Sequence, residues 1–312
     1  MKYRLAILLA TYNGEKYISD QIQSLLCQQA VELEIFISDD GSTDDTPKII
    51  QEYSEKYPEI IHILKNDGKL GGACKNFLSL VKRVDADLYM FCDQDDVWNA
   101  DKVKRSLDLY IERNCDFEPA LVHTDLKVVD KDLNIINDSY MEFMRKPKFL
   151  SWKQYLVENN NVVGCTMLIN RKLADYYKHN FDYIIVDNVL MHDSFFAILA
   201  ALVGKIVYLD DSTIKYRQHE KNTVGAIKPE NGITVVLKKL QKFKQSKELQ
   251  RKKELHIKEV LKCINEKNLK INISEGYVNL KDKGKLFRII WLIKNGILRK
   301  GIKRNIYLFL VI

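Results

Sequence analysis

The sequence has few of the features that mark secreted, membrane-spanning or disulfide-rich proteins. No run of about 18 apolar residues occurs, so we expect no helix that crosses a bilayer. Met1-Lys2-Tyr3-Arg4 leads directly into a strand-like segment, and we expect no signal peptide. The six cysteines are scattered without a CxxC pair, which predicts reduced cysteines of a cytosolic protein rather than a zinc site or a disulfide framework.

Two common nucleotide-binding motifs are also missing. No GxGxxG fingerprint follows the first apolar segment, and no glycine-rich phosphate loop ending in Gly-Lys-Ser or Gly-Lys-Thr occurs. A nucleotidyltransferase would need a glycine-rich loop with a basic residue near the first strand, and Thr11–Lys16 is a poor candidate for one. That alternative function is therefore disfavoured.

Charge is distributed unevenly along the chain. Residues 233–312 hold 21 Lys and Arg against 6 Asp and Glu, a net charge of +15, whereas residues 1–232 have a net charge of −8. We therefore predict a boundary near Ala226–Gly232, with one domain over residues 1–225 and a basic amphipathic helical extension over residues 226–312.

The first hundred residues alternate apolar strand-like segments with amphipathic helical segments. Leu5–Ala10 is a continuous apolar run, as in a strand buried on both faces of a parallel sheet. Further strands are predicted at 34–38, 60–64 and 88–92, and helices at 18–26, 47–57 (with Thr46 as N-cap) and 71–81. This order predicts an α/β fold with a doubly wound, mostly parallel, Rossmann-like sheet that binds ligands beyond the carboxyl ends of its strands.

Residues 101–225 are less regular. We predict strands at 120–125, 162–169 (broken by Gly164), 205–209 and 213–216, a hairpin at 126–137, and helices at 151–157 and 193–202.

Asp93-Gln94-Asp95-Asp96 places three carboxylates directly after the predicted strand at 88–92. Like charges this close repel, and a divalent cation is the simplest partner. Mg²⁺ and Mn²⁺ prefer oxygen ligands and keep open positions for phosphate oxygens. The motif therefore indicates a metal–phosphate site; a solvated acidic turn is the alternative.

Four motifs in this order resemble those of glycosyltransferase family 2, of the GT-A fold. They are Leu9–Asn13, Ser38–Asp44, Asp93–Asp96 and Met191–Asp193, and the resemblance covers roughly residues 5–220. The variants at 93–98, 164–166 and 216–219 look most like a bacterial rhamnosyltransferase-type subgroup. The resemblance implies a nucleotide-sugar half over about residues 1–100 and an acceptor half over about 101–225.

The resemblance also implies roles for individual residues. Those expected to bind the nucleotide sugar are Thr11, Tyr12, Asn13, Asp39, Asp40, Asp93, Asp96 and Arg217. Asp95 and His219 are expected to hold a divalent cation, Mn²⁺ or Mg²⁺. Residues implied on the acceptor side are Trp98, Asn161, Gly164, Cys165, Thr166 and His192, although Trp98 equally suits a plain core position and His219 a surface histidine.

Asp193 is the expected catalytic base. Glycosyl transfer needs a group that removes a proton from the acceptor hydroxyl as it attacks the anomeric carbon. One base on the acceptor face and one metal on the leaving-group face give a single displacement, and hence inversion. Taken alone, Asp193 would read as a helix cap.

The C-terminal segments 235–247 and 286–312 interleave basic and apolar residues. Such helices can lie on an anionic membrane surface; packing against the catalytic domain or a second subunit, in a homo-oligomer, is the alternative. We expect no nucleic-acid binding, because no stacking or groove-reading motif accompanies the charge.

Together these patterns predict an inverting, metal-dependent glycosyltransferase. It would move a sugar to a cell-surface polysaccharide or lipid-linked glycan precursor. The resemblance to the rhamnosyltransferase-type subgroup favours L-rhamnose from dTDP-β-L-rhamnose as the donor, with a UDP-linked hexose as the alternative. We expect a cytoplasmic protein, peripheral on the inner face of the cell membrane. A non-catalytic membrane-docking scaffold is the third alternative, which would not need the carboxylates that are present.

Overall fold

The structure is a computed structural model that describes residues 3–29, 32–158, 160–220, 235–266 and 268–312, and for residues 235–244 the backbone alone. The predicted boundary at 226–232 lies outside these ranges.

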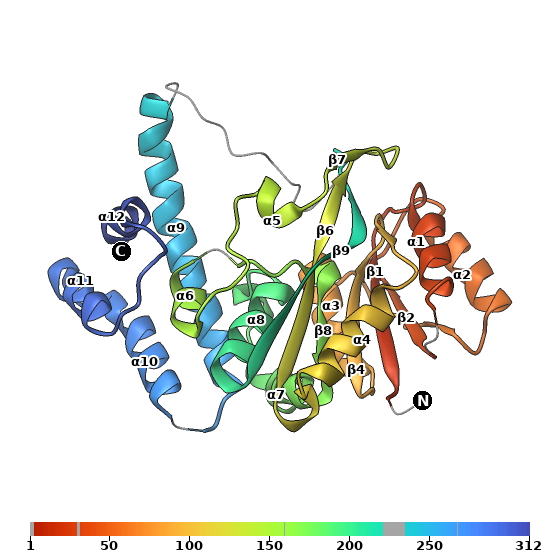
Figure 1. The fold of residues 1–312 in the computed structure, drawn as a ribbon, viewed down its shortest axis with the longest axis horizontal. Coiled ribbons are helices and arrows are strands. Elements are labelled where there is room, and N and C mark those ends of the chain that lie inside the picture. The colour runs from red at the N-terminus through yellow and green to blue at the C-terminus, as the bar shows by residue number, and fades with distance from the viewer. Residues whose placement is uncertain (1–2, 30–31, 159, 221–234, 267) are drawn as a thin grey trace.

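One mixed sheet forms the centre of the molecule (Figure 1). Its described strands run in the order β3-β2-β1-β4-β8-β6-β9-β5, with β7 paired to β6. β1 to β4 are parallel, β6 and β9 are parallel to each other, and β8 and β5 are antiparallel to their neighbours. The bounds are β1 Leu5–Thr11, β2 Glu34–Asp39, β3 Ile61–Ile63, β4 Leu88–Asp93, β5 Val97–Trp98, β6 Ala120–Val129, β7 Ile135–Asn137, β8 Leu168–Asn170 and β9 Lys205–Arg217.

Helices cover both faces of the sheet. They are α1 Ile18–Leu26, α2 Thr46–Lys56, α3 Ala73–Arg83, α4 Lys102–Glu112, α5 Tyr140–Phe143, α6 Trp152–Val157, α7 Arg171–Asn180, α8 His192–Val203, α9 Val235–Lys262, α10 Leu269–Val278, α11 Lys285–Lys294 and α12 Ile302–Val311. Short 3₁₀ turns occupy 115–117, 164–166, 181–183, 186–188 and 279–282.

The apolar run of β1 is explained by this two-sided cover. Alternate residues of a strand point to opposite faces. Ala6 and Leu8 join one hydrophobic cluster with residues of α3, α7 and α8. Ile7 and Leu9 join another with residues of α1 and α4. The strand therefore has no polar face, and the predicted doubly wound α/β architecture is confirmed.

Several predicted elements are wrong in detail. Residues 162–167 do not form a strand, because Gly164–Thr166 turn as a 3₁₀ helix before β8 begins at Leu168. The strands predicted at 205–209 and 213–216 are one continuous β9. Thr46 does not cap α2, since its Oγ1 accepts a hydrogen bond from the Gly14 amide at 2.8 Å.

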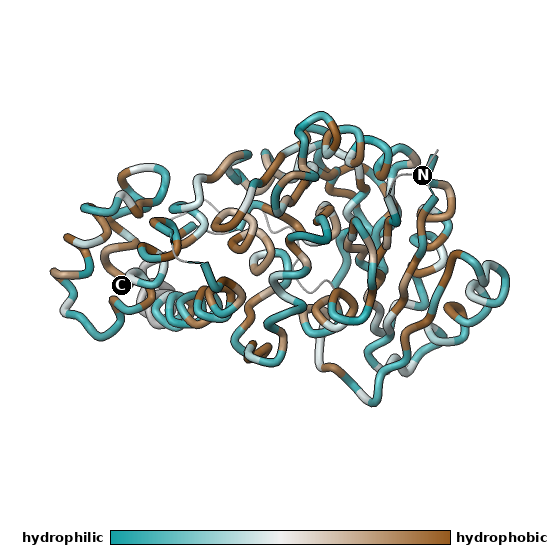
Figure 2. Tube along the Cα trace, turned by 90° about the horizontal axis from the view of Figure 1, so that it is seen from below, coloured by the Kyte–Doolittle hydropathy of each residue, from teal (hydrophilic) through white to brown (hydrophobic). Residues whose placement is uncertain are grey.

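The C-terminal helices pack on α8 and on one another (Figure 1). α9 lies along α8, and its Ile257 and Val260 share a hydrophobic cluster with Phe195. His256 Nδ1 accepts from the Leu190 amide at 3.2 Å, and the Glu259 carboxylate accepts from the Ile185 amide at 2.8 Å. Figure 2 shows hydrophobic and hydrophilic residues alternating along these helices. Some of the apolar residues belong to the hydrophobic core, and others do not. Within the described ranges, no helix has the length and apolar character needed to cross a membrane.

Candidate active site

A cavity of about 850 Å³ opens beyond the carboxyl ends of β1 and β4. Its walls also include the loop before α3, the first turn of α8 and one side of α9. The predicted site residues that line it are Thr11, Tyr12, Asp40, Asp93, Asp95, Gly164, His192 and Asp193. Predicted site residues from the first hundred residues and from residues 164–193 therefore line the same cavity.

The turns after β1 and β2 hold each other in place. Thr11 Oγ1 donates to Asp39 Oδ1 at 2.8 Å, and Ser42 donates through both its amide and its hydroxyl to the same carboxylate. Asn13, in the left-handed region with φ 49°, accepts from the Thr43 amide at 2.8 Å. Asp39 and Asn13 thus lie in the turn-to-turn contact behind the cavity wall and do not line it.

Asp40 and Tyr12 face the cavity. The Asp40 carboxylate accepts from the amides of Leu70, Gly71 and Gly72, and so fixes the loop that precedes α3. Gly71 and Gly72 have φ of 90° and 121°, conformations that glycine adopts without the strain a Cβ would cause. The Tyr12 side chain is 49% exposed at the mouth of the cavity.

Gln94 ties the acidic cluster to the β1 turn. Its Oε1 accepts from the Tyr12 amide at 2.8 Å, and its Nε2 donates to the Tyr12 carbonyl at 2.9 Å. A Cβ on Gly14 would lie 2.3 Å from Gln94 Oε1, so the absence of a side chain at Gly14 makes room for this contact. The role of Gln94 within the motif was not predicted.

The carboxylates of the cluster occupy different environments. Burial, and then the charges of Asp95 and Asp193, raise the pKa of Asp93 to about 7. Burial also raises the pKa of Asp96 well above its usual range. Asp96 Oδ1 accepts from the Arg217 amide at 3.1 Å, while Oδ2 is buried without a hydrogen-bond partner among the described residues. Burial is the main cause of both shifts, and the charges of the neighbouring carboxylates add to it.

Asp95 and His219 are brought together as the sequence suggested. Asp95 Oδ2 lies 2.7 Å from His219 Nε2, and the imidazole stacks on Tyr17 with ring centroids 4.9 Å apart. A carboxylate oxygen and an imidazole nitrogen fit a divalent cation; of the two cations expected, the nitrogen favours Mn²⁺ over the harder Mg²⁺. These residues therefore have the donor set that the predicted metal requires.

A second group of ligand atoms fits a metal less well. Asp93, Asp96 and Cys165 each place one within 4.8 Å of the others. Burial raises the pKa of the Cys165 thiol well above its ordinary value, so the thiol keeps its proton. A protonated thiol is a poor ligand for a hard cation.

Arg217 is placed differently from the prediction. Its guanidinium is buried and donates to the Asp20 carboxylate at 3.0 Å, to the Asp95 carbonyl at 2.9 Å and to the Lys131 carbonyl at 2.8 Å. It also lies over the Tyr17 ring, 4.5 Å from the centroid. Arg217 therefore supports the backbone of Asp95 from behind and does not point into the cavity as a phosphate ligand.

Three residues predicted on the acceptor side lie in the core instead. Trp98 is 3% exposed and packs with α1 and α4 rather than beneath a sugar. Cys165 is fully buried, and Thr166 Oγ1 donates to the Val163 carbonyl at 2.7 Å.

Lys102, which the sequence did not indicate, is fully buried with its Nζ 4.4 Å from the Trp98 ring centroid. Helical spacing alone gave no sign that a lysine would lie beneath the cluster.

Asp193 lies in the first turn of α8 and faces the cavity. Burial raises its pKa to about 6, a change opposed by the charge of Lys146 and by hydrogen bonds from Ser194, Asn160 and Gly164. Lys146, also unpredicted, lines the cavity and donates to the Asn160 carbonyl at 2.8 Å. A carboxylate with a pKa near neutrality, held beside a lysine, is suited to take up a proton.

His192 and Gly164 form a packed pair. The imidazole is buried, 4.2 Å from the Phe77 ring and 5.3 Å from the Phe91 ring, and burial lowers its pKa to about 3. A Cβ on Gly164 would lie 2.5 Å from His192 Nε2. The absence of a side chain at Gly164 therefore leaves room for the neutral His192 ring, whereas the sequence led us to expect that it leaves room for a ligand. Asn161 lies nearby but is buried, donating to the Pro147 carbonyl at 3.1 Å.

Gly164→Ala should destabilise the protein by about 1–3 kcal/mol, because an overpacked core must move the His192 ring. The measurement is the free energy of unfolding in urea. The double variant Gly164→Ala with His192→Ala should show much less than the sum of the two single losses. Strict additivity would contradict the proposed clash.

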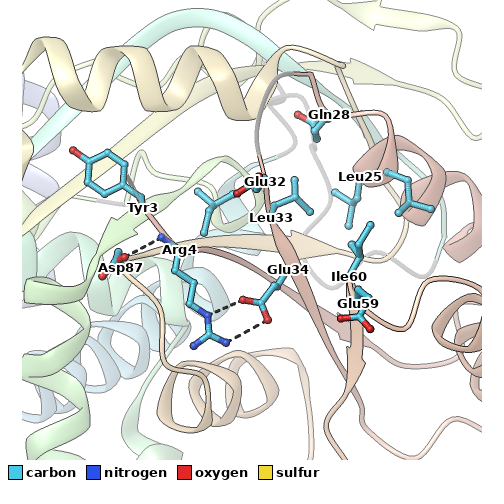
Figure 3. Close-up of a pocket in the computed structure, with 12 residues that line it drawn as sticks. Tyr3, Arg4, Leu25, Gln28, Glu32, Leu33, Glu34, Glu59, Ile60 and Asp87 are labelled. Atoms are coloured by element: carbon cyan, nitrogen blue, oxygen red, sulfur yellow. Dashed lines mark hydrogen bonds and ion pairs between the residues drawn. The ribbon is translucent and has the colours of Figure 1, made fainter. Parts of the chain in front are cut away.

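A second cavity, of about 760 Å³, lies at the opposite end of the strands (Figure 3). Arg4 Nε donates to Glu34 Oε1 at 2.6 Å, and the Arg4 amide donates to Asp87 at 2.9 Å. None of the residues in the four motifs lines it. Ligands of such sheets bind at the carboxyl ends of the strands, so this cavity is not the candidate site.

Comparison with known proteins gives a consistent family. The model of glycosyl transferase family 2 matches residues 6–178. The chain is 36% identical over 228 residues to the dTDP-rhamnosyl transferase RfbG of Shigella flexneri, covering 70% of this chain and 74% of that protein. It is 25% identical over 217 residues to the UDP-Glc:alpha-D-GlcNAc-diphosphoundecaprenol beta-1,3-glucosyltransferase WfgD of Escherichia coli, covering 68% and 79%.

Solved structures show the same GT-A fold. Residues 1–349 of S. aureus TarS superpose with a TM-score of 0.54 at 18% identity, covering 94% of this chain and 79% of that one. The mannosyltransferase PcManGT of Pyrobaculum calidifontis, in complex with GDP-Man and Mn²⁺, gives 0.55 at 14% identity, covering 100% and 86%. With the family match over more than half of the chain, the protein belongs to glycosyltransferase family 2 and is a glycosyltransferase.

Proposed function

We propose that the protein is an inverting, metal-dependent glycosyltransferase that transfers a sugar from a nucleoside diphosphate sugar to a hydroxyl group of a glycan precursor. The observation that carries the proposal is one cavity lined by Asp193, with a pKa of about 6, and by Asp93 and Asp95. His219 lies behind Asp95, with its Nε2 2.7 Å from Asp95 Oδ2. A carboxylate base and a candidate cation site within one cavity are what a single displacement requires.

In this reaction Asp193 accepts the proton of the acceptor hydroxyl as that oxygen bonds to the anomeric carbon. The bond from the anomeric carbon to the diphosphate oxygen breaks at the same time, and the nucleoside diphosphate leaves. A cation held by Asp95 and His219 would supply positive charge against the charge that develops on the diphosphate. Attack on the face opposite the leaving group inverts the anomeric configuration.

The favoured donor is dTDP-β-L-rhamnose, which would give an α-L-rhamnoside. The support is the 36% identity to a dTDP-rhamnosyl transferase. A UDP-linked hexose is the second candidate, favoured by the relative named for UDP-Glc. That relative is also named for an acceptor on diphosphoundecaprenol, a polyprenyl lipid. We therefore place the reaction on the cytoplasmic face of the cell membrane, with a lipid-linked glycan as acceptor.

A thermal-shift screen of dTDP, UDP, GDP and their sugars, with Mn²⁺ and with EDTA, tests the donor assignment. We expect the largest shift with dTDP-β-L-rhamnose in Mn²⁺. A larger shift with a UDP-hexose would select the second candidate. An equal response to all nucleotides, with and without metal, would contradict the donor site itself.

The pH dependence of transfer should report Asp193. A base acts only when deprotonated, so kcat/KM should fall as the pH decreases through about 6. Lys146→Met removes a charge that lowers the pKa of Asp193, so the acidic limb should move to higher pH. Lys148→Met, at a partly exposed lysine paired with Asp210, is the matched control and should leave the acidic limb in place. An unmoved limb in Lys146→Met would refute the assignment.

A further inference from the structure

The two last helices expose apolar residues at helical spacing. On α11, Leu286, Phe287, Ile290 and Ile293 are 72%, 53%, 56% and 54% exposed. On α12, Ile302, Ile306 and Leu310, spaced four residues apart, are 81%, 54% and 48% exposed. Residues three or four apart share one face of a helix, so each helix carries an apolar stripe on its outer surface.

These outer stripes are separate from the faces that hold the helices to the protein. Leu292 of α11 and Leu308 of α12 are fully buried in the shared hydrophobic cluster. Trp291 packs against Gly276, where an added Cβ would lie 2.6 Å from its ring. Ile297, just after α11, is also fully buried, whereas Phe287 is exposed. The exposed residues are therefore not required by the packing seen here.

Basic side chains surround the stripes. Residues 281–312 contain nine Lys and Arg and a single acidic residue, Asp282. Lys285, Lys294 and Lys303 are exposed beside the apolar positions. Lys285 Nζ donates to the Leu310 carbonyl at 3.3 Å, which places the start of α11 beside the end of α12. Both helices lie at the end of the molecule away from α1 and α2 (Figure 1).

We propose that the exposed faces of α11 and α12 form a docking surface for an anionic lipid bilayer. Helices that lie in a membrane interface are held by burial of apolar area at the level of the headgroups and by attraction of basic residues to anionic lipids. The exposed apolar side chains and the cations around them supply both. Exposed apolar patches of this kind mark interaction sites. The positive charge favours an anionic lipid surface over a second copy of this chain, because the same surface of the second copy would be equally basic and would repel it. α9 contacts α12 and also lines the active-site cavity through Leu249 and Lys253, so the docking surface and the cavity share one helix.

Vesicle sedimentation of the full chain tests the proposal, with vesicles of phosphatidylcholine alone and of phosphatidylcholine mixed with phosphatidylglycerol. We expect binding to the mixed vesicles that weakens at high salt. The double variant Phe287→Glu with Ile290→Glu should bind at least about tenfold less, because charge replaces inserted apolar area. Phe117→Glu, at a residue that is 79% exposed outside these helices, is the matched control and should bind as the wild type does.

Equal binding of the double variant and the wild type would overturn the proposal, as would equal binding to both vesicle types. A wild-type dimer that the double variant converts to monomer, without vesicle binding by either, would show that a second copy occupies the surface instead. Docking of α11 and α12 on a bilayer does not require the proposed sugar donor; only the idea that the acceptor lies at the membrane rests on the proposed function. Thermal shifts of the double variant with nucleotides test the donor site separately from docking, and they should match those of the wild type.

Discussion

Asp193→Asn should lower the rate of sugar transfer by about 10²–10⁴-fold, the usual contribution of a general base. The amide keeps the shape of the side chain and can still hydrogen-bond to the Ser194 amide through its oxygen, but it cannot accept the proton of the acceptor hydroxyl. Donor affinity should remain near the wild-type value, because the acidic cluster is untouched. The measurement is kcat/KM for transfer together with the dissociation constant of the donor.

Asp187→Asn is a suitable control. Asp187 lies in the loop before α8, its side chain is 77% exposed and its carboxylate pairs with Lys75 at the surface. Its removal should leave the rate within about twofold of wild type, as expected for an exposed ion pair. If Asp193→Asn retained wild-type turnover, another group would have to be the base.

Asp95→Asn should weaken Mn²⁺ binding by more than about 100-fold. Loss of a residue that only supports a metal ligand costs up to about 100-fold in affinity, and loss of a direct ligand should cost more. Asp95 is proposed as a direct metal ligand, with His219 Nε2 only 2.7 Å from its Oδ2. Transfer should fall in parallel at limiting Mn²⁺ and recover partly at high Mn²⁺. Calorimetric titration of Mn²⁺ in the presence of dTDP gives the affinity.

Two variants make this result interpretable. His219→Ala should show the same loss of Mn²⁺ affinity, since it removes the second member of the pair. Asp101→Asn, at a half-exposed carboxylate beside Arg105 and outside the cavity, should not. Unchanged Mn²⁺ affinity in both Asp95→Asn and His219→Ala would refute the metal site.

Much of the fold could be predicted because local pattern and tertiary burial agree. The continuous apolar run of β1 is buried on both faces, as its composition indicated. The break at Gly164 was predicted, but the 3₁₀ turn over residues 164–166 was not, because the close approach of His192 to Gly164 cannot be read from the local sequence. α4 and α7 were also missed, although α7 has an N-cap, Asn170, whose side chain accepts from the Leu173 amide.

The site residues also fall into those that the sequence could place and those that it could not. Residues at strand ends could be placed from sequence, because the topology of a parallel sheet brings those ends together. Arg217 could not, because its partner Asp20 lies 197 residues away and nothing local shows that the guanidinium points behind the cluster. Lys146 and Lys102 were missed because each lies in an ordinary polar context, and only the folded chain buries them beside carboxylates.

Release of dTDP from dTDP-β-L-rhamnose, with water as the acceptor, tests the central claim most directly. The wild-type protein should release dTDP in the presence of Mn²⁺, should stop when EDTA is added and should resume when Mn²⁺ is restored. Asp193→Asn should release dTDP far more slowly under the same conditions. Rapid release in EDTA, or release by Asp193→Asn at the wild-type rate, would contradict a metal-dependent transfer with Asp193 as its base.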